Sequence, residues 1–195
     1  MYKKLGQFAL PVLMFAFVGT AQAEVIDFGP DGSSFFKPTS VWEVFYADTT
    51  LPDYNAGGYK SVADATGNQW VAANYRVSEV AEFVAVKDVF NLDGLWLAGA
   101  WGNQTLTVTG YAGGEEIATV SFVISTTAQE YTSIFDDFKA IDSFTIRIGN
   151  EYVPGGRYWA LGSVAVTVVP EPEAYAMLLA GLGLVGVMAR RRRRI

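Results

Sequence analysis

The sequence predicts an all-β fold, an antiparallel β-sandwich of the jelly-roll type with an apolar segment at each end of the chain. Two observations lead to this prediction. Apolar and polar residues alternate with period two through most of the middle of the chain, as in strands with one buried face. Glycine-rich turns separate these stretches, and the middle of the chain shows no long 3.6-residue period. Short strands joined by turns favour a sandwich.

The first 23 residues have the pattern of a signal peptide. Lys3 and Lys4 precede an apolar run over residues 8–18. Ala21 and Ala23 flank Gln22 in an A-x-A cleavage pattern. We therefore expect signal peptidase to cut after Ala23, so that the exported domain covers residues 24–169.

Nine short segments of this domain are expected to form strands. The clearest pair is a hairpin in which Leu106 and Val108 alternate with threonines, and a turn at Gly113 and Gly114 leads into a second alternating segment. The expected strands cover residues 25–28, 41–47, 69–75, 82–87, 95–100, 105–111, 118–124, 144–148 and 164–168. The pattern indicates a single domain without a repeat.

Residues 170–195 combine three features in order. Pro170, Glu171 and Pro172 form a rigid polar turn, and residues 174–189 then contain no charge over 16 positions. A helix of that length spans roughly 24 Å, close to the ~30 Å hydrocarbon core of a bilayer. The chain then continues into the positive cluster of Arg190, Arg191, Arg192, Arg193 and Arg194. This arrangement predicts a transmembrane helix with a cytoplasmic stop-transfer signal, so the domain lies across the membrane.

The order of these three features resembles the PEP-CTERM sorting signal of Gram-negative bacteria that make exopolysaccharide. The resemblance rests on Val169-Pro170-Glu171-Pro172, the leucine- and glycine-rich run and the arginines. It implies processing by exosortase, a membrane enzyme, at or near Pro170-Glu171-Pro172. The protein would be anchored in the inner membrane first and then pass to the cell surface or the extracellular matrix.

The exported domain also resembles galactose-binding-like jelly-roll domains. The similarity is carried by an aromatic strand ending at Trp101-Gly102, the hairpin that follows and a final valine-rich strand. In many such domains the final strand opens with Leu-Asp-Asn, whereas this chain has Ala160-Leu161-Gly162-Ser163. Because of this departure, no metal or ligand role is carried over to that corner.

Composition excludes several functions for the domain. Without the two end segments, seven Lys and Arg stand against 18 Asp and Glu, a net charge of −11, which argues against nucleic acid as a partner. The chain contains neither cysteine nor histidine, so a catalytic triad is excluded. We expect no cofactor and no enzymatic activity. The candidate oxygen ligands for Ca²⁺ are Asp136, Asp137, Asn91 and Asp93, for which turns are the favoured interpretation.

Aromatic residues are the candidate ligand contacts. Five tryptophans and ten tyrosines could stack on sugar rings, although most such residues fill a core. Tyr152, Tyr158 and Trp159 flank the loop over residues 153–157, so we expect them to be exposed and to form a contact surface. A metal site is not predicted.

Three functions stay open at this point. The first is a non-enzymatic surface or matrix protein associated with exopolysaccharide or biofilm. The second is a carbohydrate-binding module, which requires an exposed aromatic patch. The third is a carboxylate-dependent glycoside hydrolase, which requires two acids facing each other across a cleft at about 5–10 Å. The expected partners are signal peptidase, exosortase, the inner membrane and extracellular polysaccharide.

Overall fold

The computed structural model describes residues 22–37, 42–47, 57–74, 79–86, 89–150, 153, 156–169, 179–186, 188 and 190. The chain divides into two compact units, one over Ala21–Glu171 and one formed by Met1–Thr20 with Pro172–Ile195. The described residues of the first unit form ten strands and one helix. They are β1 (Gln22–Asp27), β2 (Glu43–Tyr46), α1 (Gly58–Thr66), β3 (Trp70–Ala73), β4 (Val80–Val84), β5 (Val89–Gly99), β6 (Gln104–Ala112), β7 (Glu115–Ile124), β8 (Gln129–Tyr131), β9 (Ser143–Ile148) and β10 (Trp159–Val169).

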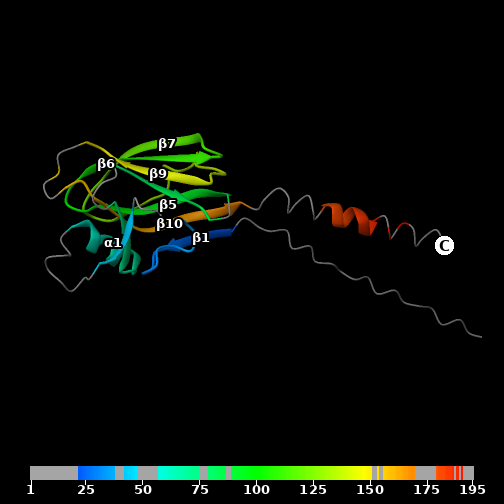
Figure 1. The fold of residues 1–195 in the computed structure, drawn as a ribbon, viewed down its shortest axis with the longest axis horizontal. Helices are drawn as coiled ribbons and strands as arrows, with labels where there is room; N and C mark the ends of the chain where they lie inside the picture. Colours follow the sequence, from blue (N-terminus) through cyan, green and yellow to red (C-terminus); the bar gives the residue numbers. More distant parts are fainter. Residues whose placement is uncertain are drawn as a thin grey trace, which may run out of the picture. The chain divides into compact units, whose positions relative to one another are not determined.

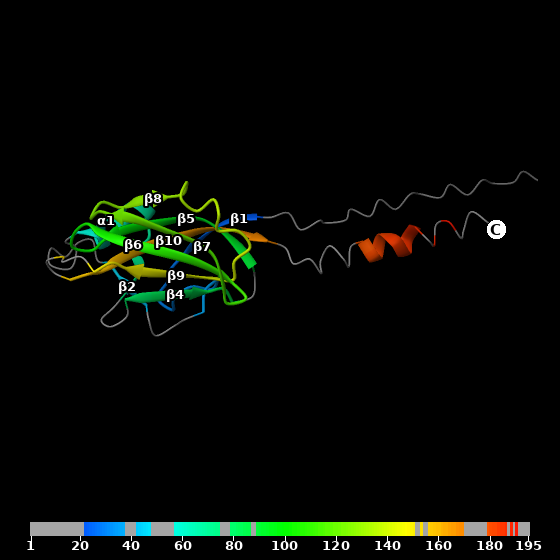
Figure 2. The same ribbon diagram turned by 90° about the horizontal axis from the view of Figure 1, so that it is seen from above.

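These strands form two antiparallel sheets. The larger sheet has the order β2-β3-β10-β5-β8, with β1 also paired to β10, and the smaller sheet has the order β4-β9-β6-β7. Figure 1 shows the sheets as two layers, with β7 and β9 on one side and β5 and β10 on the other. Seen from above, β8 and β4 lie along opposite sides of the domain (Figure 2). The predicted antiparallel β-sandwich is confirmed, whereas the jelly-roll connection stays a prediction.

Strand β10 organises the larger sheet. It pairs along its whole length with β5, from Trp159 opposite Gly99 to Val169 opposite Val89. Its other edge is shared, because Ala160 and Leu161 pair with β3 and the following residues pair with β1. Val164 and Val166 of β10 are fully buried in the main core and alternate with the half-buried Ala165 and Thr167, as in a strand with one face on the core.

The main core lies between the two sheets. The larger sheet contributes Leu92, Leu95, Leu161 and Val164 to this core, and the smaller sheet contributes residues such as Leu106 and Ile146. Its centre is aromatic: the ring of Phe83 stacks on Phe144 at 4.8 Å and on Trp42 at 5.0 Å. Since the chain has no cysteine, this apolar burial holds the sandwich together without disulfides.

Helix α1 was not expected from the sequence. Val62 and Ala63 pack on Val71, Ala98 and Ala160 in a second, smaller apolar cluster on the outer face of the larger sheet. The segment carries few strong helix formers and ends at Gly67 in the left-handed conformation. Packing against the sheet, rather than intrinsic propensity, therefore decides its structure.

Strand β5 also differs from the prediction. Asn91, Asp93 and Gly94 suggested a turn before a strand over residues 95–100, but β5 runs through them from Val89 to Gly99. The pairing with β10 shifts register between Ala165 and Val166, so Asp93 is the extra residue of a β-bulge. The short strand β8 was missed because its three residues carry no alternating apolar pattern.

In the second unit, residues 179–186, 188 and 190 are helical and exposed. Among the residues that the structure describes, no helix is long and apolar enough to cross a membrane. The predicted span over residues 174–189 includes positions outside the described ranges, so the structure does not show it.

Candidate functional site

Trp159 is a core residue. Its side chain has no exposed surface, and its ring lies 6.3 Å from that of Phe83. As the first residue of β10 it falls on the same face as Leu161, which belongs to the main core, whereas Ala160 faces α1. The expectation that Trp159 is exposed is therefore wrong, because the period-two alternation of β10 already applies at its first residue.

The other two predicted contact residues have different outcomes. Tyr158 is half-buried, and its carbonyl accepts hydrogen bonds from Ala100 N at 2.8 Å and Gln104 Nε2 at 2.5 Å. These bonds fix the backbone of the loop that precedes β10. Tyr152 lies outside the described residues. A ligand-contact role for Tyr158 stays a prediction.

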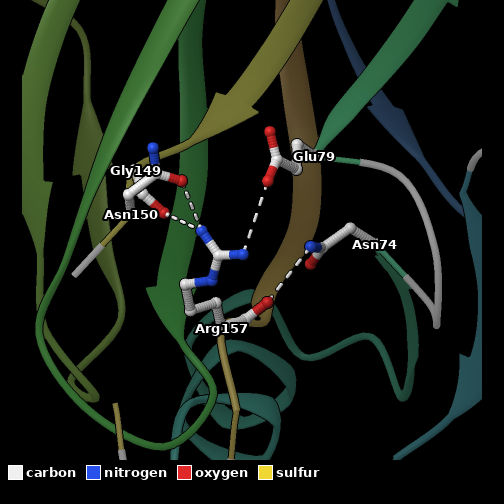
Figure 3. Close-up of polar contacts among 5 residues, drawn as sticks. All are labelled: Asn74, Glu79, Gly149, Asn150 and Arg157. Atoms are coloured by element: carbon white, nitrogen blue, oxygen red, sulfur yellow. Dashed lines mark hydrogen bonds and ion pairs between the residues drawn. The ribbon is translucent and has the colours of Figure 1, made fainter. Parts of the chain in front are cut away.

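Arg157 joins three segments at this end of the sandwich (Figure 3). Its Nη1 donates to the carbonyl of Gly149 at 2.8 Å and to Oδ1 of Asn150 at 2.7 Å, just after β9. Its Nη2 lies 3.5 Å from Oε1 of Glu79, just before β4. The guanidinium group therefore bonds the loop before β10 to the smaller sheet, and we assign Arg157 a structural role.

Asn74 completes this connection from the larger sheet. Its Nδ2 donates to the carbonyl of Arg157 at 3.3 Å, and its Oδ1 accepts from the backbone N–H of Trp159 at 2.9 Å. Asn74 is almost fully buried, so these bonds satisfy polar groups that water does not reach. The loop before β10 is therefore positioned by both sheets.

The exposed tryptophan of this region is Trp101, which follows β5. It is 38% exposed, and its ring meets that of Tyr59 edge to face at 6.3 Å and 84°. Gly102 lies against the loop before β10, because a Cβ there would stand 3.0 Å from Cγ1 of Val153. The start of α1 and the residues after β5 meet here in an aromatic corner made of Tyr59 and Trp101. Sequence reasoning named Trp101 but had no signal for its exposure.

Two of the four candidate ligands for Ca²⁺, Asn91 and Asp93, have side chains that form hydrogen bonds within the fold. Asn91 Oδ1 accepts from Ala140 N at 2.9 Å, and Asp93 Oδ2 accepts from the Thr167 hydroxyl at 2.5 Å. Asp136 and Asp137 are exposed in the turn between Phe135 and Phe138. The part of the chain that the structure describes contains no group of three or more acidic residues placed to hold a metal.

The predicted processing residues lie where the domain meets its two end segments. In β1, Ala23 pairs with Thr167 of β10, and Gln22 pairs with Val168. The chain therefore enters and leaves the sandwich at the same end of one antiparallel pair. Arg190 is helical and exposed. The remaining processing and stop-transfer residues lie outside the described ranges: Ala21, Pro170, Glu171, Pro172, Arg191, Arg192, Arg193 and Arg194.

The family comparison identifies a motif at the end of the chain. Residues 168–194 match the family model described as the PEP-CTERM protein-sorting motif. This chain therefore carries a PEP-CTERM sorting motif, and the resemblance inferred from Pro170-Glu171-Pro172 and its surroundings is confirmed. No curated protein matches the chain.

Two solved structures are similar to the chain at low identity. A DUF4465 family protein from Bacteroides caccae ATCC 43185 has a TM-score of 0.45 and 12% identity, covering 80% of this chain and 92% of its own. TmCBM61 in complex with beta-1,4-galactotriose has a TM-score of 0.32 and 14% identity, covering 68% and 90%. Both TM-scores are below 0.5, so neither similarity carries an argument about function.

Proposed function

We propose that this protein is an exported substrate of exosortase whose β-sandwich has a non-enzymatic role at the cell surface or in the extracellular matrix. Signal peptidase removes residues 1–23, and the segment over residues 174–189 holds the chain in the inner membrane of a Gram-negative cell. Exosortase then cuts at or near Pro170-Glu171-Pro172. The released sandwich associates with exopolysaccharide.

The PEP-CTERM match over residues 168–194 is the observation that carries this proposal. The match begins inside β10, at Val168, so the proposed cleavage segment follows the last strand directly. Pairing of β1 with β10 supports the same sequence of events. After cleavage behind Ala23, residues 24–27 still pair with Val166, Ala165, Val164 and Ser163, so the strand keeps most of its register.

Intact mass of the full chain tests the proposal. The chain is expressed in a Gram-negative host with and without an exosortase, and both termini are followed by mass spectrometry. We expect loss of the arginine cluster in the exosortase host alone. Glu171→Gln should block this loss, whereas Glu173→Gln, the same change two residues later, should not. Retention of the arginines in both hosts would overturn the proposal.

We propose glycan contact at the aromatic corner as a second function. The supporting observation is that Trp101 is 38% exposed and that its ring packs edge to face with the ring of Tyr59. An aromatic face of this kind stacks on the apolar face of a sugar ring, and nearby polar groups bind its hydroxyls. The fixed loop backbone at Tyr158 keeps the corner in place.

Binding of the full chain to arrayed glycans and to exopolysaccharide from the expressing cells tests the second proposal. Trp101→Ala should reduce binding at least about tenfold, a loss on the scale of one stacked ring. Tyr46→Ala is the matched control, since Tyr46 is 47% exposed and also pairs with a tryptophan ring. Equal glycan binding by the two variants and the parent chain would reject the proposal that the aromatic corner contacts glycan.

A further inference from the structure

Strand β7 is a long edge of the smaller sheet. It has ten residues, and within its sheet it pairs with β6 alone. The hydrogen bonds of the neighbouring strands show which of its backbone groups point outward. Gly149 N donates to Thr105 O at 2.8 Å, which places the N–H and C=O of Thr105 on the β9 side of β6.

Backbone groups alternate between the two sides of a strand, so Leu106 and Val108 bond toward β7. Their partners in β7 are Phe122 and Val120. The intervening residues Thr119, Ser121 and Val123 therefore point their N–H and C=O groups away from β6.

A side-chain contact supports this assignment independently. The hydroxyl of Tyr131 donates to Val123 O at 3.3 Å, from β8 of the other sheet. This hydrogen bond occupies the outward carbonyl of Val123, so the open part of the edge ends there. Within the described ranges, no backbone group outside the sheet bonds to Thr119 or Ser121. Their outward N–H and C=O groups form a short open edge.

This edge lacks the features that usually prevent pairing. From Ile117 to Ile124 the strand contains no charged residue, no proline and no glycine. Ile117 is 47% exposed and Val123 is 61% exposed. Natural edge strands are usually short, charged or interrupted by proline, because an open edge accepts another strand.

We propose that β7 is a self-association edge, which pairs antiparallel with β7 of a second copy around a two-fold axis at Val120. In this register Thr119 lies opposite Ser121 of the partner, and each such pair exchanges both of its backbone hydrogen bonds. Ala118 lies opposite Phe122. A β-bulge leaves Ile117 without a partner in β6, and the regular edge ends there. In the proposed register, Ile117 of each copy lies opposite Val123 of the other.

The side chains select this register and this partner. Hydroxyl residues face hydroxyl residues and apolar residues face apolar residues, while Glu115 and Glu116 stay at the two ends. Moving the axis to Thr119 would set Val123 opposite Glu115 and Ser121 opposite Ile117. Within the sheet, Thr107 already bonds to Ser121 at 2.7 Å and Thr109 to Thr119 at 2.9 Å. Self-pairing therefore extends hydroxyl rows that the sheet already contains.

A cysteine cross-link tests the proposal, because the chain has no cysteine of its own. Val120→Cys places the two thiols opposite each other in a non-hydrogen-bonded pair, at a Cα separation of about 4.5 Å, which suits a disulfide. Purified full chain in detergent is treated with a mild oxidant and analysed by non-reducing electrophoresis. We expect a disulfide-linked dimer.

Matched variants fix the register. Val123→Cys on the same strand should give at least about tenfold less dimer, since its two copies lie far apart across the axis. Thr119→Cys should also give little dimer, and a maximum there would indicate the other register. Thiol labelling under reducing conditions shows that each cysteine is accessible. Equal dimer from Val120→Cys and Val123→Cys would overturn the proposal.

A proline variant provides a second measurement. Ser121→Pro removes an N–H that points away from β6, so the ladder within the sheet keeps its bonds. In the Val120→Cys background it should abolish the dimer and leave the melting temperature within a few degrees. Ser121→Ala, which retains the N–H, should preserve the dimer. Dimer formation by both variants would overturn backbone pairing, and disulfides to other proteins in a lysate would identify a different partner.

Discussion

Two tryptophans near the same end of the sandwich have opposite environments. Trp159 is fully buried beside Phe83, whereas Trp101 keeps 38% of its surface exposed. Both occur next to strand ends and both neighbour a small residue in the sequence. Trp159 is the first residue of β10 and lies on its core face, whereas Trp101 lies beyond the end of β5, and this difference in position separates the packing residue from the surface residue.

Replacement of these tryptophans should have unequal effects on stability. Trp159→Ala should lower the free energy of unfolding by about 3–5 kcal/mol, because it leaves a large cavity in the core. Trp101→Ala should cost less than about 1 kcal/mol, as is usual for surface positions. Urea denaturation of the full chain measures both. Similar losses for the two variants would contradict the assignment of Trp159 to the core.

Asp27 links stability to pH. Partial removal of water from its carboxylate, at the end of β1, raises the pKa above the ordinary value of 3.8. The folded state therefore binds the proton more tightly than the unfolded state, so stability falls as pH rises through the folded-state pKa. Asp27→Asn should unfold at a higher temperature than the parent at pH 7. The difference should vanish below about pH 3.8, where both states are protonated.

At the scale of elements, glycine allows α1 to lie close to the larger sheet. A Cβ on Gly162 of β10 would stand 2.4 Å from Cγ1 of Val62 and 2.8 Å from Cγ2 of Thr66. The side chain of Val62 is fully buried and surrounded by other residues, so it cannot shift to make room for a Cβ. The close approach therefore depends on the absence of a side chain at position 162.

Gly162→Ala should displace α1 and lower the free energy of unfolding by about 1–3 kcal/mol. Gly29→Ala is a suitable control, because a Cβ there meets nothing closer than Gly32 O at 3.9 Å. Its effect should stay within about 0.5 kcal/mol. Chemical denaturation distinguishes the two variants, and equal midpoints would show that the helix does not contact the sheet this closely.

Elements differ in how well their sequence predicts them. All nine expected strands overlap observed strands, because period-two alternation next to glycine-rich turns is a strong local signal. Helix α1 has no such signal, since its nine residues acquire their apolar partners only from the sheet. The polar residues Asn91 and Asp93 led to the prediction of a turn, but they lie within β5, where the structure contains a β-bulge. A bulge depends on the partner strand and leaves no separate local pattern.

At the scale of the whole molecule, charge opposes the proposed self-association. Residues 24–169 carry a net charge of −11, so two copies repel each other. Dissolved salt screens this repulsion, with a Debye length of about 10 Å at 0.1 M and about 30 Å at 0.01 M. The dimer yield of Val120→Cys should therefore rise between these concentrations. A yield that falls with added salt would indicate an electrostatic attraction instead of edge pairing.

The sorting signal and the sandwich were predictable to different degrees. The Pro-Glu-Pro turn, the apolar run and the arginines are recognisable because each works through local composition. The candidate ligand contacts were not predictable, since exposure depends on which residues pack against a side chain. Of the three aromatic contacts expected, Trp159 proved to be core, and the exposed Trp101 lies in a different segment, just after β5.

The sequence by itself determined the antiparallel strands, the acidic charge and the PEP-CTERM motif, because alternation, composition and short motifs act over a few residues. Tertiary structure alone decided the pairing of β1 with β10, the burial of Trp159, the aromatic corner at Trp101 and the open edge of β7. These features join residues far apart in the chain. Their physical basis is the register between strands, which sets the neighbours of every side chain and is not encoded in any single segment.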